Sequence, residues 1–94
     1  MIVIRNCFVA KPGQASKLAA QLKDASGVMG VKCRVLTDVT GDFNRVVLEI
    51  EAQDFTDFEA RMRQYRTDEA FRDKMKGYTD LWVTGHREIL QVAE

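Results

Sequence analysis

Few residues of this chain carry side chains that could do chemistry, and Asn6 is the first of them. It lies in the strand-like run Ile2–Ala10 and shares the strand parity of Ile2, Ile4 and Phe8. We therefore expect its amide in an apolar setting. A buried amide without a partner costs about 1–3 kcal/mol. Asn6 is thus expected either to bond within the protein or to contact a ligand.

His86 is the only histidine, and by strand parity it shares a face with Trp82 and Glu88. A histidine beside a carboxylate could act as a general base near neutral pH. A surface or interface ion pair is the commoner role. Cys7 and Cys33 fall in separate strand-like runs without metal-ligand spacing. We expect them to be unbonded thiols, and we expect no metal site.

No other catalytic signature is present: neither a phosphate loop nor a nucleophile elbow occurs. The 14 basic and 14 acidic residues cancel, which argues against a nucleic-acid partner. The longest apolar stretches fall far short of the ~20 residues that a membrane span needs. The first residues lack a basic start followed by an apolar run. These patterns predict one cytoplasmic domain, residues 1–94, with no membrane partner.

The elements that must position these residues follow the order β-α-β-β-α-β. This is the ferredoxin-like order of an α+β protein, with a four-stranded antiparallel sheet, the first and third strands central and the helices on one face. Asp54 and Thr67 are expected helix caps, and Gly85 a bulge. The segment 40–44 is expected to turn a hairpin. The predicted elements are strands over 2–10, 31–40, 45–51 and 81–92, a helix over 14–24, and a helical unit over 54–77 that breaks near residue 66.

One layer of helices leaves the other sheet face uncovered. Four strands of about six residues would expose on the order of 400 Å² there, near the upper range for a monomer. We therefore predict a homodimer formed through the open sheet face. Arg5 and Glu49 lie on that face, either as a cross-strand pair or as solvated charges. Parity assigns the same face a set of small apolar residues: Val3, Cys7, Val9, Val47, Val31, Cys33 and Val35.

Three segments resemble a known superfamily. They are the opening strand running into Lys11-Pro12-Gly13, the hairpin 40–45 that leads into 46–51, and the ending 85–90. With them the whole chain resembles the dimeric α/β barrels, which include NIPSNAP-like proteins and antibiotic-biosynthesis-type monooxygenases. The resemblance implies a homodimer with a ligand site between the sheet and the later helices. The ligand-binding candidates are Asn6, Phe8, Met62, Tyr65, Phe71, Met75 and Trp82.

Three functions stay open, because this superfamily hosts several. The chain would be a homodimeric barrel protein that binds a small apolar molecule, a cofactor-independent monooxygenase acting on a polycyclic or quinone-like substrate, or a purely structural or protein-interaction dimer. A pocket of about 300 Å³ or more would favour the first two. The monooxygenase also needs a base facing that pocket, for which Asn6 and His86 are the catalytic candidates.

A heme-degrading activity is not expected. The heme-degrading relatives use a strand asparagine together with a tryptophan and a histidine in the helical region after the third strand. Asn6 matches the first of these. The other two would fall near Met62 or Arg63 and near Met75, so neither residue is present. We expect no cofactor.

Overall fold

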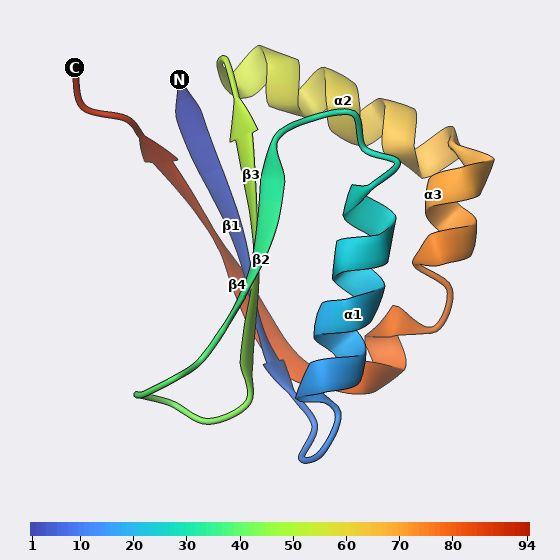
Figure 1. The fold of residues 1–94 in the computed structure, drawn as a ribbon. Coiled ribbons are helices and arrows are strands. Elements are labelled where there is room, and N and C mark those ends of the chain that lie inside the picture. Colours follow the sequence, from blue (N-terminus) through green and yellow to red (C-terminus); the bar gives the residue numbers. More distant parts are fainter.

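The computed structural model describes residues 1–94 (Figure 1). Its four strands form one antiparallel sheet in the order β2-β3-β1-β4, and all helices lie on one face of it (Figure 1). This is the predicted α+β, ferredoxin-like fold. The elements are β1 Ile2–Ala10, α1 Ala15–Ser26, β2 Cys33–Thr37, β3 Arg45–Ala52, α2 Phe55–Thr67, α3 Glu69–Lys74, a 3₁₀ turn Tyr78–Leu81 and β4 Trp82–Gln91.

The core lies between the sheet and the helices, with β1 at its centre. Ile4 of β1 is directly opposite Ile50 of β3 and is fully buried. Leu18 and Leu22 of α1 meet it from the helical layer and are also buried. The alternation of β1 and β3 and the helical spacing of α1 therefore converge on one apolar layer, which fixes the face toward which Asn6 points.

The ends of the helices are set by side-chain caps. Asp54 accepts a hydrogen bond from the Asp57 backbone N–H at 2.8 Å, as predicted. The second cap is Asp68 rather than Thr67, because the carboxylate of Asp68 accepts from the backbone N–H of Phe71 at 2.8 Å. Thr67 is the last residue of α2, and its hydroxyl donates to a backbone carbonyl within that helix. None of the helices combines the length and apolar character needed to cross a membrane.

Strand β2 is shorter than predicted and its faces are reversed. Cys33 is opposite Ile50 and Val35 is opposite Leu48, so both face the helices. Val31, just before the strand, packs on the same core. The expectation that these three residues lie on the open face was wrong. Parity tells which residues share a face, but the pairing with β3 decides which face that is.

An irregularity in β4 also changes which of its side chains face the helices. Val9 pairs with Thr84 while Ala10 pairs with Trp82, so that Val83 is the extra, bulged residue. Trp82 therefore turns to the helix face, whereas the residues from 84 onward alternate in the opposite phase. The predictions that Trp82 shares a face with His86 and that the bulge lies at Gly85 were both wrong.

Gly85 has a different role in β4. It pairs regularly with Phe8, and a Cβ on it would lie 2.7 Å from the carbonyl oxygen of Cys7. Real Cβ atoms do not approach a backbone oxygen so closely. Glycine at this position therefore lets β4 lie close against β1 beside the aromatic side chain of Phe8.

The loop that joins β2 to β3 projects on the side of the sheet away from the helices (Figure 1). Its residues Val39 and Phe43 are 95% and 84% exposed. Gly41 and Asn44 take positive φ angles, 104° and 63°, which permit the tight turns of this loop. The loop therefore presents apolar side chains beside the uncovered sheet face.

Candidate functional site

A cleft of about 400 Å³ lies between the sheet and the later helices. Strands β1 and β4 form its floor, and α1, α2, α3 and the segment that follows α3 supply its walls. We call it the sheet–helix cleft. Its apolar lining consists of Phe8, Leu22, Leu48, Met62, Phe71, Met75, Tyr78 and Trp82. Five of the seven ligand-binding candidates are in this list, and Asn6 lines the cleft as well.

A polar pair interrupts the apolar lining. Arg87 of β4 is opposite Asn6 of β1, and its Nε donates to Asn6 Oδ1 at 2.7 Å. A guanidinium can only donate, so the pairing fixes the orientation of the Asn6 amide and leaves its NH2 group directed elsewhere. The Arg87 guanidinium also lies 5.6 Å from the centre of the Phe58 ring, a cation–π contact that holds it in place.

Trp82 also lines the cleft. Its ring packs on Phe8 with 5.4 Å between ring centres and on Tyr78 with 6.3 Å. The indole N–H is buried and has no hydrogen-bond partner. Buried donors of this kind are rare, because an unmade hydrogen bond costs about 1–3 kcal/mol. The donors shown in the lining of the cleft are therefore those of Asn6 and Arg87.

Tyr65 lies outside the sheet–helix cleft. It is buried, it stacks near Phe71, and its hydroxyl donates to the backbone carbonyl of Met29. The hydroxyl is therefore occupied by a partner within the protein. Burial raises the pKa of the Tyr65 phenol above its ordinary value. Tyr65 does line an adjoining hollow of about 360 Å³, which shares Met62, Phe71, Met75 and Arg87 with the cleft.

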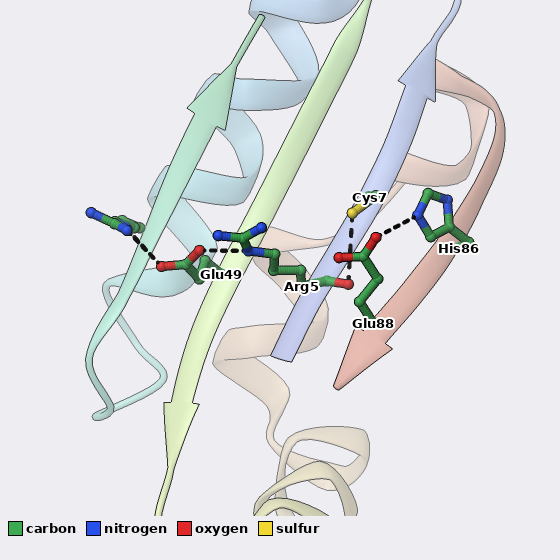
Figure 2. Close-up of polar contacts among 6 residues, drawn as sticks. Arg5, Cys7, Glu49, His86 and Glu88 are labelled. Carbon is green, nitrogen blue, oxygen red and sulfur yellow. Dashed lines mark hydrogen bonds and ion pairs between the residues drawn. The ribbon is translucent and has the colours of Figure 1, made fainter. Parts of the chain in front are cut away.

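The side chain of His86 lies on the other face of the sheet (Figure 2). His86 is opposite Cys7 in the β1–β4 pairing, and its Nε2 is 3.3 Å from Glu88 Oε1. Burial, together with the negative charge of Glu88, raises the pKa of the Cys7 thiol above its ordinary value. The two catalytic candidates, Asn6 and His86, thus point to opposite sides of the sheet.

The same open face carries a buried acid. Glu49 is 7% exposed, and it accepts from Arg5 Nε at 2.9 Å and from Arg34 Nε at 2.8 Å. Of the two roles that the sequence left open for Arg5 and Glu49, the structure has the cross-strand pair (Figure 2). Burial alone would raise the pKa of Glu49, but the hydrogen bonds from the two arginines outweigh it and hold that pKa below its ordinary value.

Sequence reasoning missed Arg87. An arginine next to His86 in a strand is usually a solvated charge. Its position opposite Asn6 depends on a pairing between two residues that are 81 positions apart. The one available signal was parity, since Arg87 alternates with Gly85 and Ile89 and so lies on the face opposite His86. Parity alone did not reveal that this face is the one covered by helices.

No protein-family model matches the sequence, and no curated protein does. Solved structures do match over nearly the whole chain. An uncharacterized NIPSNAP domain protein from Burkholderia xenovorans superposes with a TM-score of 0.86 at 16% identity, over 99% of this chain and 95% of that one. A NIPSNAP family protein from Agrobacterium tumefaciens gives 0.85 at 12% identity, over 99% and 93%.

A protein from Chloroflexus aurantiacus, provisionally named an antibiotic biosynthesis monooxygenase, is also similar. Its TM-score is 0.76 at 15% identity, over 99% of this chain and 94% of that one. The chain therefore has the fold of the NIPSNAP-domain and antibiotic-biosynthesis-monooxygenase-like proteins. This confirms the predicted fold.

Proposed function

We propose that the protein is a homodimer that binds a small, largely apolar molecule in the sheet–helix cleft, and that this molecule carries a hydrogen-bond acceptor such as a carbonyl or carboxylate oxygen. The observation that carries the proposal is the polar pair of Asn6 and Arg87 in the otherwise apolar lining of the cleft. An apolar space with a few convergent polar groups is the usual form of a small-molecule site. The free NH2 group of Asn6 and the Arg87 guanidinium both donate, so the complementary ligand accepts.

The homodimer is supported by the uncovered sheet face. Val47 and Leu36 are partly exposed there, Leu90 is 48% exposed, and no helix covers them. The neighbouring loop adds the almost fully exposed Val39 and Phe43. Packing two such faces together would remove this apolar surface from water, and the balanced charge of the chain opposes association little.

Ligand binding is favoured over monooxygenase chemistry by the position of the candidate base. Although His86 borders the cleft, its side chain lies on the open face of the sheet beside Glu88, and the ionisable group beside Asn6 is Arg87, which cannot accept a proton. A filled, purely structural core is disfavoured by the volume of the cleft, about 400 Å³.

The binding proposal is tested by following the single tryptophan. Its indole N–H gives one cross-peak in a ¹H–¹⁵N spectrum of the labelled protein. We expect 2-naphthoate to shift this peak and the Asn6 side-chain peaks, and to bind more tightly than naphthalene. R87Q should weaken 2-naphthoate binding by about tenfold, since a hydrogen bond to a charged group is worth roughly 1.5–3 kcal/mol.

The matched control is R63Q, which removes an exposed arginine of α2 that does not line the cleft. Its affinity for 2-naphthoate should equal that of the unmodified protein. The proposal is wrong if millimolar 2-naphthoate leaves the indole peak unmoved, or if R63Q and R87Q weaken binding equally.

A further inference from the structure

We propose that Cys7, His86 and Glu88 form a binding site for a divalent transition-metal ion, best suited to Zn²⁺, on the open face of the sheet. The sulfur, imidazole and carboxylate atoms that these residues offer all lie within 4.8 Å of one another. The three come from two adjacent strands: His86 is directly opposite Cys7, and Glu88 follows two residues later on the same face (Figure 2). This differs from the sequence-based expectation of no metal site, because residues 79 positions apart meet only through strand pairing.

The spacing suits tetrahedral coordination. Metal–nitrogen and metal–oxygen bonds of about 2.0–2.1 Å at tetrahedral angles separate the two ligand atoms by about 3.3–3.4 Å. His86 Nε2 and Glu88 Oε1 are 3.3 Å apart, which is long for a hydrogen bond and equal to that separation. The side chains of His86 and Glu88 are 63% and 43% exposed, so small rotations can bring them toward the buried sulfur of Cys7.

The local charges also suit a divalent cation. A thiolate and a carboxylate together offset two positive charges, and a soft sulfur with an imidazole selects Zn²⁺ over Mg²⁺ or Ca²⁺. Two arginines border the site: Arg45, whose charge acts on the Cys7 thiol, and Arg5, whose side chain extends away from Glu88 and is bound by Glu49 (Figure 2). Coordination would release the thiol proton to the solvent, because the metal binds the thiolate.

The site has room for further ligands. Cys7 and Glu88 both line a hollow of about 370 Å³ that is bounded by the loop between β2 and β3. This hollow provides an entry path and leaves the fourth position for water or another small ligand. Three protein ligands leave one position open within a single chain, and in the proposed homodimer this site would lie between the two packed sheets.

Cobalt(II) tests the proposal, because a thiolate bound to Co²⁺ gives an intense near-ultraviolet charge-transfer band. The metal-free protein is titrated with Co²⁺ in a non-chelating reductant. We expect about one Co²⁺ per chain with that band, and displacement of the ion by Zn²⁺. C33S alters the cysteine on the helix face and should keep the band, whereas C7S should lose it.

H86A changes an exposed side chain, so it should fold normally while binding Co²⁺ at least about tenfold more weakly, the scale reached even for partners of metal ligands. The proposal is overturned if the unmodified protein shows no thiolate–cobalt band at millimolar Co²⁺, if C7S retains it, if C33S loses it, or if H86A binds as tightly as the parent.

Discussion

Glu49 offers the sharpest test of how the open face is stabilised. The substitution is E49Q, which keeps the shape of the side chain and removes its charge. Glu49 is 7% exposed and accepts two hydrogen bonds from arginines, at 2.9 and 2.8 Å. A hydrogen bond to a charged group contributes roughly 1.5–3 kcal/mol when buried, and exposed ion pairs about 0.2–1 kcal/mol.

The exposure of the two arginine partners decides where the loss of unfolding free energy falls between these two limits. Their side chains, in Arg5 and Arg34, are 41% and 67% exposed, so water can solvate them once Glu49 is neutral. We therefore expect E49Q to lower the free energy of unfolding by about 1–2 kcal/mol at pH 7. E51Q is the matched control: Glu51 lies on the same face of β3, pairs with Lys32 at only 3.8 Å, and should change stability by less than about 0.5 kcal/mol.

The pH dependence of stability shows which protonation state of Glu49 stabilises the folded protein. The pKa of Glu49 is lower in the folded protein than its ordinary value, so its charged form stabilises the fold above the unfolded pKa of about 4.3. That stabilisation is lost as the pH falls through the folded pKa. The unfolding free energies of parent and E49Q, measured by urea denaturation at one protein concentration, should converge below about pH 4. A difference that stays constant from pH 7 to pH 3, or a loss equal to that of E51Q, would refute this account.

Three further predictions concern other elements. D54A should destabilise the protein by about 1 kcal/mol in urea denaturation, because it removes the cap of α2; an unchanged midpoint would mean that this cap contributes nothing. G85A should cost about 1–3 kcal/mol, since its Cβ would lie 2.7 Å from a backbone oxygen of β1, and equal stability would contradict that close approach. Light scattering at micromolar concentration should give about twice 10.7 kDa, and E49K should weaken the dimer; a monomeric parent would exclude the homodimer.

The sequence alone determined the class of fold and the helix-facing residues of the central strands. The alternation of apolar residues in β1 and β3 and their helical spacing in α1 are local patterns. Both patterns place apolar side chains in the same core. They were enough to predict the strand order, the face toward which Asn6 points, and the shared face of Arg5 and Glu49. The cap at Asp54 was also readable, because a capping carboxylate acts within three residues.

What only the tertiary structure decided was the phase of the edge strands β2 and β4. Each edge strand pairs with only one neighbour. Which of its side chains lie on the helix-covered face therefore depends on the register and on bulges that the local pattern does not encode. The bulge at Val83 turned Trp82 into the sheet–helix cleft and left His86 on the open face. The same pairing set Arg87 against Asn6 and His86 beside Cys7. Both candidate sites of this protein are thus assembled between strands far apart in sequence, because a hydrogen-bonded ladder brings together side chains that no spacing along the chain connects.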